Sequence, residues 1–258
     1  MMNPKATPPR NREAAPPLKA TERWYSHRMG RELSLVRWGS YGVPVLLFPT
    51  AGGDAAEIDR MGLLGAIWPL VDAGRIKVYS CDSAAGMAMV AHEGSPEHRQ
   101  WLFNQYQQAI AAEVVPAIQR DSPGAAPIIA AGASIGAFNA LAVTCRFPEL
   151  FGAAVCMSGT FSIERFIGAP FTDDLYYASP LSFLAGLGGA HLDTLRQRFI
   201  ILAHGEGPWE DPVSARAAAD ILGAKGVPNR VDNWGPSFDH DWPTWHQMLP
   251  LYLDDLVP

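Results

Sequence analysis

A serine between two glycines stands where a short apolar run changes into a helix-like segment. The run 126–131 has the length and apolar character of a buried parallel strand, and 137–143 continues with helical character. Between them, Gly132, Ser134 and Gly136 give the pattern G-x-S-x-G. A sharp turn from strand to helix would lift the Ser134 hydroxyl clear of the backbone. The sequence therefore predicts a strand–turn–helix unit with Ser134 as a candidate nucleophile.

Strand-like and helix-like segments alternate along most of the chain. This succession predicts an α/β fold with a mostly parallel central sheet and helices on both faces. A chain of 258 residues can form one domain of this kind, and we expect that domain to span residues 21–258. The predicted strands are 43–48, 76–81, 126–131, 153–157, 199–203 and 230–234, and the predicted helices are 58–71, 98–119, 137–143, 213–224 and 242–253.

Three segments depart from this alternation. The β-rich stretches 24–28 and 32–38 flank residues 29–31 and predict an N-terminal antiparallel hairpin at a sheet edge. Residues 160–195 mix Gly, Pro and aromatic side chains, which predicts an irregular insertion near the site with room for a short helix. Residues 1–20 are rich in Pro, Ala and basic residues, and we expect them to form a flexible extension.

Charge and cysteine content exclude several classes of partner. The formal net charge is −6 and basic residues do not cluster, so we expect no nucleic acid and no anionic membrane as a partner. Residues 1–20 lack the apolar core of a secretory signal and no window is long and apolar enough to span a membrane, which indicates a cytoplasmic protein. Cys81, Cys145 and Cys156 lie in apolar surroundings, which predicts buried free thiols.

A serine hydroxyl needs a base within hydrogen-bond reach, and the base needs a group that orients it. Around a G-x-S-x-G turn, the chain order is serine, acid, histidine. His240 follows the last predicted strand and its loop, where a base would emerge at the carboxyl edge of the sheet, whereas His246 lies inside the terminal helix. His240 is therefore the candidate base, and the alternative is a solvated loop histidine.

Three carboxylates follow the strand that ends at residue 203, namely Glu206, Glu210 and Asp211. Glu210 is favoured as the acid because it lies far enough beyond the strand to reach back toward His240. Asp211 precedes Pro212 and a predicted helix, as an N-cap residue does. Glu206 stays open as an alternative acid.

An acyl-transfer reaction also needs two N–H groups that stabilise a tetrahedral oxyanion. Ile135 supplies one because it follows the nucleophile at the start of a helix. The second is expected from the loop 49–53, where glycine permits a close backbone approach; Gly52 is our choice and Ala51 the near alternative. The same glycines are compatible with a simple turn.

Taken together, these segments resemble the Putative esterase branch of the α/β-hydrolases, which includes S-formylglutathione hydrolase (esterase D) and the mycolyltransferases. The resemblance covers roughly residues 24–256 and implies an α/β-hydrolase fold. It also implies that Ser134 is the nucleophile, His240 the base and Glu210 the acid, acting on a small-molecule ester or acyl substrate. It rests on the N-terminal hairpin, on residues 48–53, on the G-A-S-I-G turn, and on residues 157–159, 207–211 and 240–245.

The expected activity is hydrolysis of carboxylic esters through an acyl-enzyme, without a cofactor or a metal. Two alternatives stay open: transfer of the acyl group to another acceptor, and a non-catalytic binding protein with this fold. An Asp239-His240-Asp241 metal site lacks a second histidine at useful spacing. Assembly into a homo-oligomer is also left open.

Aromatic residues gather around the acid and base segments. They suit a pocket for an aromatic acyl or alcohol group, although packing that holds these loops explains them equally well. They are Trp209, Trp234, Phe238, Trp242 and Trp245, with Tyr176 and Tyr177 in the insertion.

Overall fold

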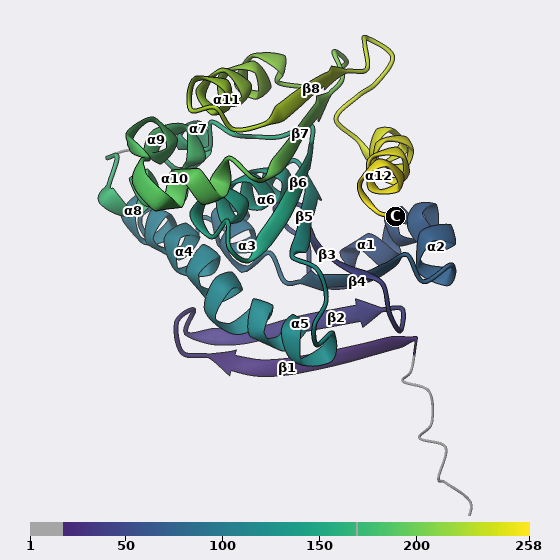
Figure 1. Ribbon diagram of the computed structural model, residues 1–258. Helices are drawn as coiled ribbons and strands as arrows, with labels where there is room; N and C mark the ends of the chain where they lie inside the picture. Colours follow the sequence, from purple (N-terminus) through teal and green to yellow (C-terminus); the bar gives the residue numbers. More distant parts are fainter. Residues whose placement is uncertain (1–17, 169) are drawn as a thin grey trace, which may run out of the picture.

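Residues 18–168 and 170–258, which the computed structural model describes, form an eight-stranded sheet with helices on both faces (Figure 1). The strand order is β1-β2-β4-β3-β5-β6-β7-β8. β1 pairs with β2 and β2 with β4 in antiparallel fashion, and every other neighbouring pair is parallel. The strands are β1 (Lys19–Ser26), β2 (Arg31–Trp38), β3 (Val43–Phe48), β4 (Ile76–Cys81), β5 (Ile128–Ala133), β6 (Phe151–Met157), β7 (Phe199–His204) and β8 (Asn229–Asn233).

The central strands are buried on both faces, which is why their sequences are almost continuously apolar. Successive side chains of a strand point to opposite faces, so they enter two separate cores. In β3, Leu46 and Phe48 pack in one core, and Val45 and Leu47 pack in the other. The predicted mostly parallel sheet and the N-terminal hairpin are confirmed.

The helices divide between these two cores. α1, α2 and α12 cover one face, on the right in Figure 1, and α3 to α11 cover the other. The helices are α1 (Glu57–Arg60), α2 (Leu63–Asp72), α3 (Ala84–Val90), α4 (Pro96–Ala109), α5 (Val115–Asp121), α6 (Ile135–Arg146), α7 (Glu164–Ile167), α8 (Asp173–Ala178), α9 (Pro180–Phe183), α10 (Gly189–Leu195), α11 (Pro212–Ala224) and α12 (Trp242–Leu256).

Two predicted helices are interrupted in the structure. Residues 98–119 contain a π-helical turn, η1 (Ile110–Val114), between α4 and α5. Pro116 has no N–H to give to a carbonyl four residues earlier, which favours a change of helical pitch just before it. The predicted helix 58–71 is divided between α1 and α2 because Gly62 has φ 79°, a conformation outside a right-handed helix. The helix α3 was not predicted.

The insertion at 160–195 is more helical than the sequence suggests. It contains α7 to α10 and a 3₁₀ turn, η2 (Leu184–Gly186) (Figure 1). Within it, α7 and α8 pack against α4, and α9 packs against α6 and α11. Buried amide side chains of α4 hold it: Gln100 Nε2 donates to the carbonyls of Gly168 and Pro170, and Gln100 Oε1 accepts from Thr172. These bonds explain why polar residues lie on a buried helix face.

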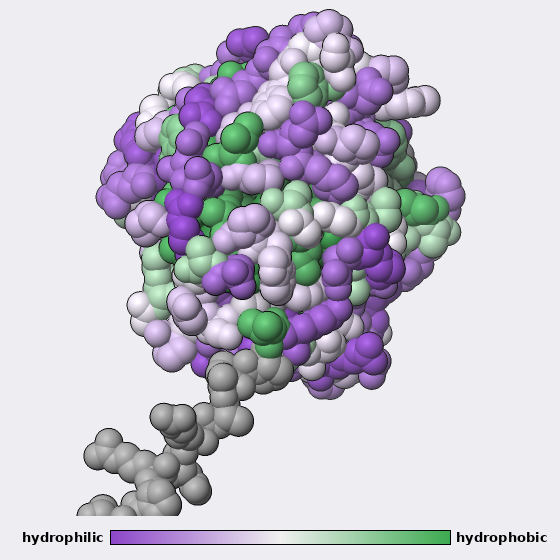
Figure 2. All heavy atoms as spheres, turned by 90° about the vertical axis from the view of Figure 1, so that its right-hand side faces the viewer, coloured by the Kyte–Doolittle hydropathy of each residue, from purple (hydrophilic) through white to green (hydrophobic). Residues whose placement is uncertain are grey.

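The hairpin begins within the segment expected to be a flexible extension. Residues 1–17 of that expected extension lie outside the described residues. Lys19 and Ala20 pair with β2, so strand β1 begins before residue 21. The three cysteines are buried and free, as predicted. Among the described residues, no helix is long and apolar enough to cross a membrane. Figure 2 shows the face that carries α1, α2 and α12, where apolar residues are scattered among hydrophilic ones.

The parallel strands end along one edge of the sheet. Their register sets this edge, because the paired residues of neighbouring strands lie at the strand ends or one position before them. The segments that follow these strands therefore start side by side, which is the usual place for a site in an open parallel sheet. The pairs are Phe48 with Gly132, Ala133 with Met157, Met157 with Ala203, and His204 with Asn233.

Candidate active site

Ser134 occupies a strained turn between β5 and α6. Its φ of 58° and ψ of −123° are unfavourable for a residue with a side chain. Hydrogen bonds hold the turn: Ser134 N donates to Met157 O at 3.0 Å, and Ser134 O accepts from Thr160 N at 3.2 Å. The predicted strand–turn–helix unit is confirmed.

The two glycines of the turn have no room for a side chain. A Cβ on Gly132 would lie 2.5 Å from the carbonyl carbon of Gly136, where helix and strand approach each other. A Cβ on Gly136 would lie 2.4 Å from Phe48 O and 2.8 Å from Pro49 O. The start of α6 therefore rests directly on the backbone where β3 ends.

A pocket of about 660 Å³ opens beside Ser134. It brings together three residues that the sequence analysis selected and that lie far apart in the chain: Ser134, Glu210 and His240. They follow β5, β7 and β8 at the edge where the strands end. The remaining lining residues are Thr160, Arg165, Phe166, Trp209 and Asp211.

Two loops place Glu210 and His240. We call residues 205–211 the acid loop and residues 235–241 the base loop. They pack so closely that a Cβ on Gly205 would lie 1.9 Å from Phe238 O. Backbone hydrogen bonds join them: Glu206 N to Gly235 O at 2.9 Å, Gly207 N to Phe238 O at 3.1 Å, and His240 N to Pro208 O at 3.3 Å.

The Glu210 carboxylate is held by a buried serine. Ser158 Oγ donates to Glu210 Oε1 at 2.6 Å and accepts from Trp245 Nε1 at 2.9 Å. Burial raises the pKa of Glu210 above its ordinary value, and the hydrogen bond from Ser158 opposes this rise. The other oxygen, Oε2, is buried without a hydrogen-bond partner among the described residues.

The His240 imidazole lies in a similar environment. Its ring packs edge to face against the Trp245 ring, with the two ring centres 5.3 Å apart. Burial lowers the pKa of His240 below its ordinary value, and the nearby Asp241 carboxylate opposes this. Its Nδ1 atom is buried and, within the described chain, has no hydrogen-bond partner. Glu210 and His240 thus each keep one buried polar atom available in the same pocket.

The alternative acids and base have structural partners instead. Glu206 accepts a hydrogen bond from Asn233 at 2.7 Å and does not line the pocket. Asp211 caps α11 by accepting from Ser214 N at 3.0 Å, as its position before Pro212 predicts. His246 Nε2 forms a hydrogen bond of 2.9 Å with the carbonyl oxygen of Met61.

A metal site at Asp239-His240-Asp241, which the sequence analysis did not favour, would use Asp241 beside His240. Asp241 instead caps α12, where its carboxylate accepts from Trp242 N at 2.7 Å. Among residues 18–168 and 170–258, no group of three or more His, Cys, Asp or Glu side chains is placed to hold a metal ion.

The loop 49–53 is fixed by a residue that sequence reasoning missed. Thr50 N and Thr50 Oγ1 both donate to the carboxylate of Glu57, each at 2.7 Å. Gly53 N donates to Thr50 O. In the described chain the N–H groups of Ala51 and Gly52 make no hydrogen bond, so these two candidate oxyanion donors are both available. Neither residue is among those that line the pocket.

Most of the aromatic residues near the site pack rather than line it. Trp234 contacts Phe238 and Tyr252, and Trp242 contacts Trp245. Tyr176 and Tyr177 line a different pocket, beside Arg146 and Phe147. Of the predicted aromatic set, Trp209 alone lines the pocket beside Ser134.

Ser158, Thr160, Arg165 and Phe166 were not selected from the sequence as site residues. Ser158 carries a usable signal, because it directly follows the buried strand β6 at the edge where Ser134 follows β5. Arg165 and Phe166 belong to the insertion, whose path depends on its packing against α4. No local pattern could place them.

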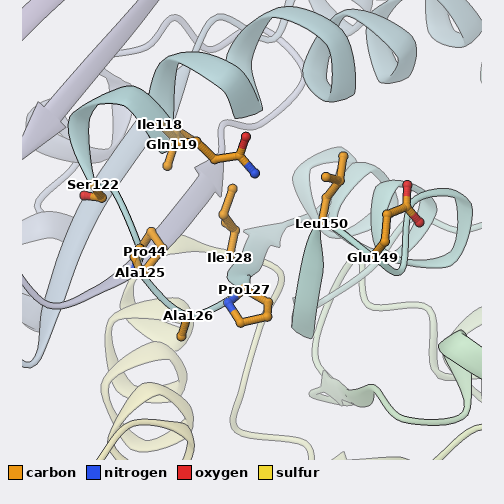
Figure 3. A pocket seen from close by; sticks show the side chains of 11 residues that line it. Pro44, Ile118, Gln119, Ser122, Ala125, Ala126, Pro127, Ile128, Glu149 and Leu150 are labelled. Carbon is orange, nitrogen blue, oxygen red and sulfur yellow. The ribbon is translucent and has the colours of Figure 1, made fainter.

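A second cavity lies at the opposite end of the parallel strands (Figure 3). Its volume is about 310 Å³, and it is lined by Pro44 at the start of β3, by the segment before β5, and by Glu149 and Leu150 before β6. None of the predicted catalytic residues reaches it. The pocket beside Ser134 is therefore the candidate active site.

A family profile described as "Putative esterase" matches residues 79–254, more than half of the chain. The chain belongs to this family. It is therefore an esterase, a hydrolase of carboxylic esters, as the resemblance implied. A comparison with curated proteins finds no match.

Solved structures show the same α/β-hydrolase fold. A ferulic acid esterase is 18% identical with a TM-score of 0.69, and the match covers 92% of this chain and 97% of that one. A fluorophosphonate-binding serine hydrolase of Staphylococcus aureus is 14% identical with a TM-score of 0.64, covering 92% and 97%. An S-formylglutathione hydrolase of Agrobacterium tumefaciens is 12% identical with a TM-score of 0.65, covering 92% of each chain.

We predict that Gly136→Ala destabilises the esterase, because its Cβ would meet the carbonyls of Phe48 and Pro49. The expected loss is about 2–3 kcal/mol in the free energy of unfolding, or roughly 5–10 °C in Tm. Gly223→Ala is the matched control, because a Cβ there meets nothing within 4 Å and should stabilise α11 by about 0.5–1 kcal/mol. Equal melting temperatures of the two variants would contradict the packing argument.

We predict that Glu57→Ala lowers kcat about 10- to 100-fold with little change in KM, because the loop 49–53 loses its anchor. Glu57→Gln should recover part of the rate, since its amide oxygen still accepts one bond from Thr50. Asp59→Ala is the control, because it removes an exposed ion pair with Lys19 from the same helix. Steady-state kinetics on one ester tests this, and an equal kcat for Glu57→Ala and Asp59→Ala would refute it.

Proposed function

We propose that this esterase is a serine hydrolase that acts through an acyl-enzyme on Ser134. In this proposal His240 is the general base and acid, and Glu210 orients its imidazole. The observation that carries the proposal is the single pocket lined by Ser134, Glu210 and His240. Their chain order agrees with the order expected around a G-x-S-x-G turn.

His240 Nε2 takes the proton of Ser134 Oγ as that oxygen attacks the ester carbonyl carbon. The same nitrogen then gives the proton to the departing alcohol, which leaves the acyl group on Ser134. Water repeats the sequence on the acyl-enzyme and releases the acid. We propose that His240 Nδ1–H donates to Glu210 Oε2 during the reaction. The described chain does not make this bond, and it would satisfy two buried atoms that have no partner there.

Burial of the His240 ring lowers its pKa, which suits it to act as a general base. A lowered pKa keeps the His240 imidazole neutral near pH 7, so that it can accept the serine proton. When the imidazole becomes charged during the attack, the Glu210 carboxylate stabilises that charge in poorly hydrated surroundings. Ser158 keeps the carboxylate in place from the other side.

The oxyanion is stabilised by Ile135 N–H at the start of α6 and by a second N–H from the loop 49–53. Gly52 is the proposed donor, with Ala51 as the alternative. The close approach of Gly136 to Pro49 O supports this assignment, because it sets the loop beside the first turn of α6. The first-turn N–H groups of a helix have no partner within the helix.

Labelling with an alkyl fluorophosphonate tests the nucleophile. Intact-mass analysis should find one adduct on the native protein and none on Ser134→Ala. Absence of an adduct on folded native protein would favour the non-catalytic alternative and contradict the proposal. A competing alcohol in the ester assay distinguishes hydrolysis from acyl transfer, since transfer would yield a new ester instead of free acid.

The acid is tested by parallel substitutions. Glu210→Gln should lower kcat by about 10³- to 10⁴-fold, because the imidazole loses its orientation and the stabilisation of its charge. Glu206→Gln should change kcat less than about threefold, since Glu206 bonds Asn233 outside the pocket. A large loss in Glu206→Gln alone would reverse the assignment.

The pH dependence of kcat/KM tests the base. Only neutral His240 accepts a proton, so activity should fall as the pH decreases through its lowered pKa, which lies below 6.5. Protonation of Glu210, whose pKa is raised above 4.5, adds to the same acid limb. For a neutral ester, kcat/KM should be constant by about pH 7.5. A midpoint above pH 7 would contradict the assigned environment of His240.

A further inference from the structure

Trp209 stands apart from the other tryptophans near the site. It is 90% exposed, more than any other large hydrophobic residue that the structure describes, yet it lines the pocket beside Ser134. Trp234, Trp242 and Trp245 by contrast pack edge to face against neighbouring rings. Packing therefore does not account for the Trp209 side chain.

The backbone at Trp209 also opposes a tryptophan. Residues 207–210 form a turn in which Glu210 N donates to Gly207 O at 3.3 Å, Pro208 is the second residue and Trp209 is the third. Trp209 has φ 69°. With proline second and a positive φ third, this is the pattern of a type II turn, whose third residue is normally glycine. A bulky residue held in this conformation without packing points to a use of its side chain.

An aromatic surface from the insertion lies on the same pocket. Phe166 is 48% exposed, and the guanidinium of Arg165 lies 4.8 Å from the centre of its ring. Arg165 Nη2 donates to Asp211 Oδ2 at 2.9 Å. Asp211 is itself held at the start of α11 by its bond from Ser214 N. The Arg165 guanidinium is thereby fixed to the acid loop that carries Trp209.

We propose that Trp209 and Phe166 bind a planar aromatic group of the substrate while its ester carbonyl lies at Ser134. This inference rests on the proposed function and names its substrate class: esters that carry an aryl group in the acyl or the alcohol part. A flat ring can bury the exposed faces of both side chains, and aromatic pairs gain stability from offset or edge-to-face contacts. A pocket of about 660 Å³ has room for an aryl group together with the ester.

Two pairs of esters test the proposal. The members of each pair have nearly the same size but differ in the planarity of the ring, and they share the methanol leaving group in the first pair and the acetyl group in the second. Methyl 3-phenylpropanoate and methyl 3-cyclohexylpropanoate place the ring in the acyl part. Benzyl acetate and cyclohexylmethyl acetate place it in the alcohol part. The native enzyme should prefer the aryl member of at least one pair in kcat/KM, and the preferred pair identifies the part of the substrate that is recognised.

In Trp209→Gly the aryl preference should fall about 3- to 10-fold, mainly through KM. Phe166→Ala should reduce it independently, and Trp209→Phe should retain most of it. Tyr177→Ala is the control, because this exposed aromatic residue lines a different pocket and should leave the preference unchanged. The Tm of Trp209→Gly should be at least that of the native protein, because glycine relieves the positive φ.

An unchanged aryl preference in both Trp209→Gly and Phe166→Ala would overturn the proposal. A Tm of Trp209→Gly below that of the native protein would also overturn it, because the indole ring would then serve packing. The fluorophosphonate adduct separates this failure from that of the proposed function. An adduct on Ser134 with no aryl preference rejects only the aryl site. Folded native protein that forms no adduct rejects the catalytic proposal on which the inference rests.

Discussion

The contact between Gly136 and the backbone at the end of β3 is the constraint on which the site depends. Because Gly136 has no Cβ, the first turn of α6 can lie against the carbonyls of Phe48 and Pro49. That approach sets Ser134 and the loop 49–53 next to one another, and Glu57 then fixes the loop through Thr50. A nucleophile and its proposed oxyanion donors thus share one packing contact, which explains a strained serine between two glycines.

The proposed acid and base are placed by a second close contact, between the acid loop and the base loop. Gly205 and Gly207 allow the two backbones to touch, and the loops are joined by hydrogen bonds rather than by side-chain packing alone. Burial there moves the pKa of Glu210 up and the pKa of His240 down. Both shifts disfavour charge in the resting site, so the charge that develops on the imidazole during the proposed reaction depends strongly on the neighbouring carboxylate.

The residues that line the pocket beside Ser134 come from two kinds of segment, the loops that follow strands and the insertion. Ser134, Glu210 and His240 follow strands, whereas Arg165 and Phe166 come from an insertion held by the buried amides of α4. The insertion can change in sequence without disturbing the strand ends, because it reaches the core through separate contacts. In our proposals the insertion contributes Phe166 to substrate preference, whereas Trp209 comes from the acid loop that also carries Glu210.

The residue pattern was enough to predict the mostly parallel sheet and the candidates Ser134 and His240, but it left Glu206 open beside Glu210 as the acid. Strands buried on both faces must be apolar, so 43–48 and 76–81 could be recognised to the residue, and Ser134 was marked by glycines that only a tight turn requires. Tertiary structure alone decided what several polar and aromatic residues do. Glu206 and Glu210 are only four positions apart. The path of the acid loop places Glu206 in a hydrogen bond with Asn233 and places Glu210 in the pocket beside Ser134. Trp209 and Trp245 are equally apolar, yet one is exposed and the other buried, because burial depends on contacts with segments distant in the chain that no local pattern encodes.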